Sequence, residues 1–132
     1  RRLYQFDIEL GMAFQLQDDL LDSYGGEELG KTIGGDILEG KKSYLMVTAM
    51  SRADGEQREV LRHTYKDAAL SPAEKIARVR AVFDALDVPR LTEQQISLRF
   101  DRALATLDGL NVPDARKEPL REYARSLMGR RK

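Results

Sequence analysis

Apolar residues recur at helical spacing along most of the chain and predict an all-α fold. Intervals of three, four or seven residues place side chains on one face of a helix. The first predicted helix, 3–22, carries such a stripe at Leu3, Leu10, Phe14 and Leu21. No segment shows the sustained alternation of a half-buried strand. Further helices are predicted over 43–52, 56–66, 72–86 and 92–107, with a last one toward the C-terminus.

Local signals separate the predicted helices. The sequence Ser-Pro-Ala-Glu at 71–74 begins one of them, because serine caps, proline suits the first turn and glutamate closes a capping box. Val88-Pro89 is expected to interrupt the helical pattern. Residues 24–35 hold five glycines and are expected to form an ordered loop. No low-complexity linker divides the chain, so we expect a single all-α helical bundle over residues 1–132.

Composition narrows the classes of function. Among the 132 residues, 22 Lys and Arg balance 22 Asp and Glu, so a basic footprint for nucleic acid is absent. The chain holds no cysteine and one histidine, His63, which excludes a thiolate nucleophile and a histidine-rich zinc site. No run of about 18 apolar residues could span a membrane. We expect a cytoplasmic protein.

The informative stretch lies at the end of the first predicted helix. Gln15, Asp18, Asp19 and Asp22 lie at helical spacing and share one face. Neighbouring like charges cost about 0.2–0.5 kcal/mol each, and carboxylates late in a helix oppose its dipole. A bound cation would offset both penalties, and carboxylate and water ligands suit Mg²⁺. A solvated acidic face without a ligand is the open alternative.

A glycine-rich segment with lysines follows the acidic face. Gly30-Lys31-Thr32 and Gly34-Gly35-Asp36 come first, and Lys41 and Lys42 follow shortly after. Glycine lets the backbone approach a ligand closely, and lysine acts as a point charge on phosphate. Loop lysines alone are usually only solvated. Their combination with an acidic face predicts a metal site followed by cations that suit phosphate.

These residues resemble the second aspartate-rich region of the trans-isoprenyl diphosphate synthases, the polyprenyl synthetase family. That family has a Phe-Gln pair, a DDxxD motif, a Gly-Lys loop, a Gly-x-Asp and then a Lys before a helix. Short-chain bacterial members of the farnesyl or geranylgeranyl type look most similar. The matching positions are Phe14, Gln15, Asp18, Asp19, Asp22, Gly30, Lys31, Gly35, Asp36 and Lys41.

The resemblance implies an isoprenoid-synthase-type fold, in which helices surround a deep cavity. It also implies prenyl transfer: an allylic diphosphate ionises with the help of Mg²⁺, and isopentenyl diphosphate attacks the resulting cation. This chain would supply the C-terminal part of such an enzyme. The family's first DDxxD motif and its isopentenyl diphosphate site have no counterpart here. We therefore expect the chain alone to be inactive, and the full-length enzyme to be a homodimer.

The resemblance also assigns roles to individual residues. Asp18 would be the principal metal ligand, and Asp19 and Asp22 would support it. Lys31 and Lys41 would contact the allylic diphosphate, Lys41 as part of the catalytic set with Asp18. Two further positions complete the site: Gln15, which would face the reacting centre as a catalytic and substrate-binding residue, and Phe14, which would wall the pocket.

Two other functions stay open, and one further expectation follows. A terpene cyclase also uses aspartate-rich helices and Mg²⁺, although the Gly-Lys loop fits chain elongation better. A non-enzymatic helical module would carry the acidic cluster only as a solvated face. Because partner helices of the family are missing here, we expect an exposed apolar patch around Leu10, Phe14 and Leu21, which would favour self-association. At the basic C-terminus, Arg131 and Lys132 are candidates for covering the isopentenyl diphosphate site.

Overall fold

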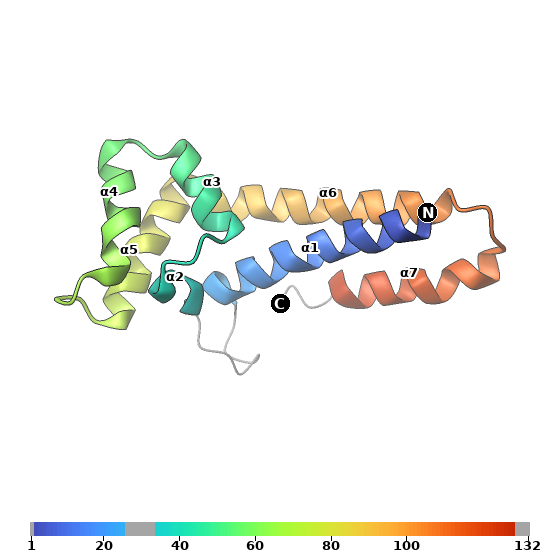
Figure 1. Cartoon of the computed structure of the whole chain (residues 1–132), viewed down its shortest axis with the longest axis horizontal. Coiled ribbons are helices and arrows are strands. Elements are labelled where there is room, and N and C mark those ends of the chain that lie inside the picture. Colours follow the sequence, from blue (N-terminus) through green and yellow to red (C-terminus); the bar gives the residue numbers. More distant parts are fainter. Residues whose placement is uncertain (1, 26–33, 129–132) are drawn as a thin grey trace. The chain divides into compact units, whose positions relative to one another are not determined.

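A computed structural model describes residues 2–25 and 34–128, and every regular element in these ranges is helical (Figure 1). The predicted all-α class is therefore confirmed for this part of the chain. None of its helices is both long and apolar enough to cross a membrane. The helices are α1 (Arg2–Tyr24), α2 (Gly35–Glu39), α3 (Tyr44–Arg52), α4 (Gly55–His63), the 3₁₀ turn η2 (Thr64–Lys66), α5 (Pro72–Ala85), α6 (Val88–Asp108) and α7 (Asp114–Met128).

The chain divides into two compact units. The first consists of Arg1–Asp18 and Glu93–Lys132, and the second of Asp19–Thr92. Helices α1 and α6 each contribute to both units. The single bundle that we expected over residues 1–132 stays a prediction.

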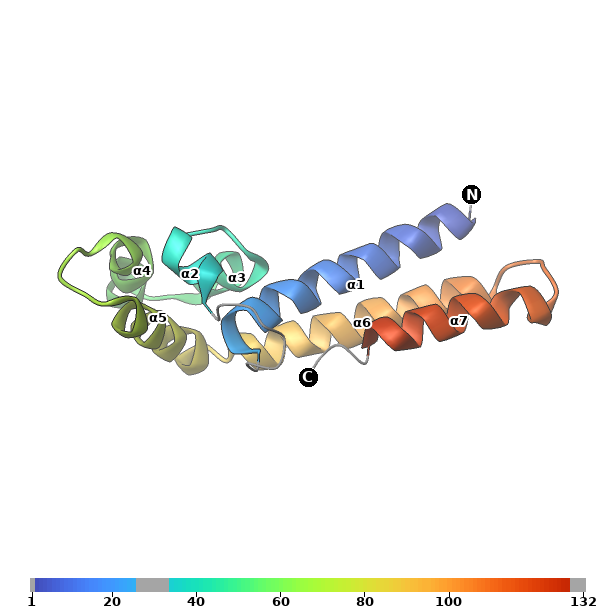
Figure 2. The same ribbon diagram turned by 90° about the horizontal axis from the view of Figure 1, so that it is seen from below.

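In the first unit, α6 and α7 form an antiparallel hairpin and lie side by side in both views (Figures 1 and 2). Lys117 of α7 donates a hydrogen bond of 2.8 Å from Nζ to the carbonyl of Asp108 at the end of α6. From α1, Glu9 accepts a hydrogen bond of 2.7 Å from the hydroxyl of Thr106 in α6. In this unit, α6 buries residues at intervals of four and three: Ile96, Phe100, Ala103 and Leu107.

The buried face of α1 differs from the predicted stripe. Leu3 is 48% exposed, and Phe14 and Leu21 are only half-buried. Of the four residues predicted to form the buried stripe, only Leu10 is buried. The prediction missed Phe6 because it stepped from Leu3 to Leu10, and it missed the other buried positions because small and polar residues carry no hydrophobic signal. The side chains of this unit that α1 buries are Phe6, Leu10, Ala13 and Gln17.

Helix α5 is the centre of the second unit, where it contacts α2, α3, α4 and η2. Its start is the predicted capping box: the Ser71 hydroxyl accepts from the Glu74 N–H at 3.2 Å, and the Ser71 N–H donates to the Glu74 carboxylate at 2.8 Å. Pro72 occupies the first turn, where no intrahelical N–H is required. The core of this unit is formed by Ile37, Leu45, Met46, Ala49, Leu61, Val79, Val82 and Phe83.

The break before α6 lies earlier than predicted. Asp87 adopts a left-handed conformation with φ 63°, and α6 begins at the next residue, Val88. Pro89 therefore lies in the first turn of α6 and does not interrupt a helix, because its missing N–H is not needed there. The predicted start at residue 92 was wrong for this reason. One turn after Val88, the hydroxyl of Thr92 donates to the Val88 carbonyl at 2.8 Å.

Candidate functional site

The end of α1 is joined to the start of α2 through Asp22. Its carboxylate accepts a hydrogen bond of 2.8 Å from the backbone N–H of Asp36. The first N–H groups of a helix lack intrahelical partners, and the residue that precedes α2, Gly34, has no side chain to cap them. Gly34 has φ +88°, and a Cβ there would lie 2.5 Å from the Ile76 side chain. Asp22 therefore supplies the cap that position 34 cannot carry.

The segment after α2 brings Lys41 to the same place. The Lys41 ammonium lies 3.7 Å from the Asp36 carboxylate, and the Lys41 N–H donates to the Asp36 carbonyl at 2.9 Å. Gly40 makes this reversal possible with φ +69°. A Cβ at Gly40 would lie 2.4 Å from the Tyr65 ring, so the turn requires glycine in both conformation and space. Asp22, Asp36 and Lys41 thus form one cluster.

Asp19 is buried, with 7% of its surface exposed. Its carboxylate accepts a hydrogen bond of 3.0 Å from the Tyr44 N–H at the first residue of α3. The Ser43 hydroxyl caps the same helix by accepting from the Met46 N–H at 3.3 Å. Since buried polar groups need partners, Asp19 has a structural use at the start of α3. Its role as a supporting metal ligand stays a prediction.

The electrostatics of the cluster favour an added cation. Burial raises the pKa of the Asp36 carboxyl above its usual range, and the charge of Asp22 raises it further. Lys41 opposes this shift, and the carboxylates of Asp19 and Glu39 add to it. Several neighbouring carboxylates therefore raise the pKa of Asp36 more than Lys41 lowers it. Mg²⁺ prefers oxygen donors of this kind.

The donors are not assembled into a closed cage. Within residues 2–25 and 34–128, no three side chains of the types His, Cys, Asp and Glu converge on a point that could hold a metal ion. Mg²⁺ usually keeps several waters and needs only one or two carboxylates together with substrate phosphates. The residues present therefore fit such an ion in their chemistry, with substrate oxygens completing its shell.

The other predicted site residues lie on α1 or outside the described ranges. Asp18 is half-buried, and Gln15, one turn before it, is exposed. Phe14 lines a cavity of about 290 Å³ in the first unit, beside Leu10 and Tyr123. Lys31 lies outside the described residues. Whether these side chains act together at a substrate stays a prediction.

Asp36 belongs to the cluster but was not among the predicted site residues. It contributes its N–H to Asp22 and its carbonyl and carboxylate to Lys41. The signal for it was visible in the sequence, because Asp36 belongs to the Gly-Asp pair that matches the family pattern. Its place in the cluster depends on two left-handed glycines, which spacing alone does not reveal.

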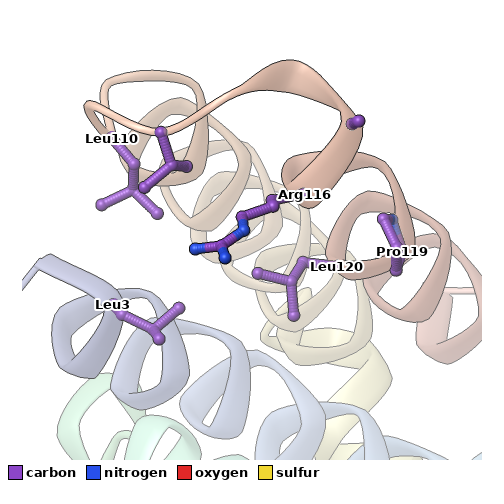
Figure 3. A pocket seen from close by; sticks show the side chains of 7 residues that line it. Leu3, Leu110, Arg116, Pro119 and Leu120 are labelled. Atoms are coloured by element: carbon purple, nitrogen blue, oxygen red, sulfur yellow. The ribbon is translucent and has the colours of Figure 1, made fainter.

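A larger cavity, of about 970 Å³, lies in the first unit (Figure 3). Leu3 of α1 and Leu120 of α7 line it. Leu110 and the Arg116 side chain also line it. Among the described residues, Arg116 is the one charged side chain that lines it. With a single cation and no described carboxylate for a metal, this cavity does not suit a metal-bound diphosphate.

Comparison with known proteins identifies the family to which this helical chain belongs. Residues 1–85 match the model of the polyprenyl synthetase family. The chain belongs to this family.

Individual relatives agree with that assignment. Human farnesyl pyrophosphate synthase is 35% identical over 106 residues, which are 80% of this chain and 25% of that protein. Component 2 of the Geobacillus stearothermophilus heptaprenyl diphosphate synthase is 36% identical over 120 residues, 88% of this chain and 35% of that protein.

A solved structure is similar over nearly the whole chain. It is the Corynebacterium glutamicum geranylgeranyl pyrophosphate synthase, complexed with isoprenyl diphosphate and magnesium, with a TM-score of 0.82 and 35% identity. The match covers 93% of this chain and 35% of that one. The chain thus spans between a quarter and about a third of the length of the three relatives compared.

Proposed function

We propose that a protein carrying this chain is a trans-isoprenyl diphosphate synthase, which joins isopentenyl diphosphate to an allylic diphosphate. The observation that carries the proposal is the cluster of Asp22, Asp36 and Lys41 at the end of α1, in a chain of the polyprenyl synthetase family. Carboxylates for a cation and a lysine for phosphate oxygens are the groups that such a reaction needs.

In this proposal the chain's residues bind and orient the allylic substrate. Asp18 and Asp22, one turn apart on α1, would hold the metal with their carboxylates, and Asp19 would support them. Lys41 and Lys31 contact the diphosphate. Phe14 walls the pocket for the hydrocarbon chain, and Gln15 faces the reacting centre.

The reaction begins when the carbon–oxygen bond of the allylic diphosphate breaks and its electron pair leaves with the diphosphate. Bound Mg²⁺ would supply the positive charge that stabilises this leaving group. Lys41 adds a second positive charge and can exchange its ion pair with Asp36 for one with the diphosphate. The π electrons of isopentenyl diphosphate then form the new carbon–carbon bond and leave a cation. A carbon next to this cation loses a proton to the released diphosphate, which restores a double bond.

The test is turnover by a synthase that carries this chain, incubated with isopentenyl diphosphate, an allylic diphosphate and Mg²⁺. We expect an elongated prenyl diphosphate. Asp18→Ala should lower kcat roughly a thousandfold or more, because a catalytic metal contributes several kcal/mol and about 1.36 kcal/mol is tenfold in rate. Asp101→Ala, at an exposed position of α6, is the matched control and should be neutral.

Other products would identify the other functions. Release of a hydrocarbon from the allylic diphosphate alone would indicate a terpene cyclase. Normal turnover by Asp18→Ala would contradict the metal-ligand role, and an unreactive protein with intact fold would favour a non-enzymatic module. We further propose that the full-length enzyme is a homodimer, which sedimentation of the active sample tests directly.

A further inference from the structure

A second cluster of cations lies in the second unit, around a cavity of about 290 Å³. Lys42, Arg62 and Lys66 line it together with His63, and none of the described Asp and Glu residues does. The cationic residues come from the segment after α2, from the end of α4 and from η2. Three permanent positive charges therefore surround one small cavity.

Carboxylates compensate this charge only in part. Glu59 lies 3.8 Å from Arg62 and 3.2 Å from His63. Lys42 and Lys66 take part in none of the ion pairs among residues 2–25 and 34–128. Like charges that are only partly compensated repel one another, so an anion in the cavity would be stabilised.

The floor of this cavity is apolar and well supported. Met46 and Leu61 line it with 8% and 2% of their surfaces exposed. Tyr65 forms another wall, and its backbone carbonyl accepts a hydrogen bond of 2.8 Å from Lys75. The Lys66 ammonium lies 5.9 Å from the centre of the Tyr65 ring. An apolar floor beneath a cationic rim matches a ligand with an anionic head and an apolar group.

We propose that this pocket binds a small organic phosphate. Lys42, Arg62 and Lys66 contact the phosphate, and the apolar part of the ligand rests on Met46 and Leu61. The volume is near the lower end for small-molecule sites, which is about 300 Å³. Because the cationic side chains themselves meet the phosphate, binding needs no metal. Lys41 of the proposed metal site does not line this pocket, although Gly40 and Lys42 on either side of it do. The proposal does not depend on prenyl transfer.

The test is a titration of the protein with phenyl phosphate in EDTA, followed by the amide NMR signals of Leu61 and Tyr65. We expect saturable shifts, and weaker binding as salt rises, because exposed charges are screened. Inorganic phosphate has the same head without the apolar group and should bind several-fold more weakly. Lys42→Ala and Lys66→Ala should each weaken phenyl phosphate binding roughly tenfold, since losing one hydrogen bond to a charged group raises the dissociation constant by about this factor.

A control variant shows whether binding depends on this pocket in particular. Arg58→Ala removes an exposed cation one turn before Arg62 on α4 that does not line the pocket, so binding should not change. Equal weakening by Arg58→Ala, or equal affinity for phenyl and inorganic phosphate, would overturn the proposal.

Discussion

The carboxylate of Asp19 accepts a hydrogen bond from the backbone N–H of Tyr44, at 3.0 Å. The middle aspartate of the acidic motif is therefore an acceptor for the start of α3, and it is buried there. Asp22 does the same for α2. The aspartates of α1 thus hold in place the two helices that flank Lys41.

Two replacements of Asp19 test whether its carboxylate stabilises the start of α3. Asp19→Ala leaves the part-buried N–H of Tyr44 without its acceptor, so the free energy of unfolding should fall by about 1–3 kcal/mol. Asp19→Asn keeps an oxygen acceptor and should cost less than half of that. Urea unfolding of both variants measures the difference. Equal losses would mean that the charge, and not the hydrogen bond, stabilises α3.

Neutralising Lys41 should weaken binding of the allylic diphosphate and slow its ionisation. In a synthase carrying this chain, Lys41→Ala should raise KM for the allylic substrate and lower kcat, each by roughly tenfold, because a charge-assisted contact is lost. Lys41→Arg should recover part of the loss. Steady-state kinetics checks this, with Arg58→Ala as the neutral control. Equal small effects in both alanine variants would show that Lys41 is only solvated.

The raised pKa of Asp36 gives stability a defined dependence on pH. Because burial and the charge of Asp22 raise this pKa above its usual range, the folded state binds the proton more tightly than the unfolded state. The contribution of this group to stability is present at low pH and falls as pH rises through the folded pKa. Thermal unfolding in EDTA should therefore show Asp36→Asn gaining on the wild type as pH rises from about 4 to about 7. A constant difference in Tm over this range would contradict the assignment.

The Ser71 cap offers a stability prediction that is independent of function. Ser71→Ala removes the acceptor for the Glu74 N–H and should lower the free energy of unfolding by about 0.5–2 kcal/mol. Ser126→Ala, at an exposed position inside α7, is the matched control and should change it by less than about 0.5 kcal/mol. A loss at Ser126 as large as the loss at Ser71 would show that the cap contributes nothing specific.

Helix starts and helical segments could be predicted well, because they depend on interactions between residues a few positions apart in the sequence. The capping box at Ser71 and the existence of a helix through Phe100 needed only sequence spacing. The buried face of α1 was less predictable, because Ala13 and Gln17 are buried without being strongly apolar.

The acidic cluster, too, could be predicted only in part from local sequence. The helical spacing from Asp18 to Asp22 follows from the sequence, but the position of Asp36 does not. It depends on the Ile76 side chain beside Gly34 and on the Tyr65 ring beside Gly40. These are contacts between segments far apart in the chain, and no local pattern encodes them.

The exposed apolar surface of α1 lies at other positions than predicted, and it bears on self-association. Leu10 is buried, whereas Tyr4, Ile8 and Met12 are 68%, 44% and 41% exposed. These three residues are spaced by four and therefore lie along one side of the helix. Exposed apolar patches of this kind favour association.

We expect the purified 132-residue chain to dimerise or associate further as its concentration rises, through this side of α1. Ile8→Lys with Met12→Lys should shift the weight-average mass toward the monomer, because two charges would have to be desolvated in the contact. Val47→Lys, at a residue of α3 that is 54% exposed, introduces the same kind of charge elsewhere and should leave association unchanged. Sedimentation equilibrium over a roughly hundredfold range of concentration measures all three samples. A wild-type chain that stays monomeric throughout, or an equal effect of Val47→Lys, would show that the exposed side of α1 does not drive association.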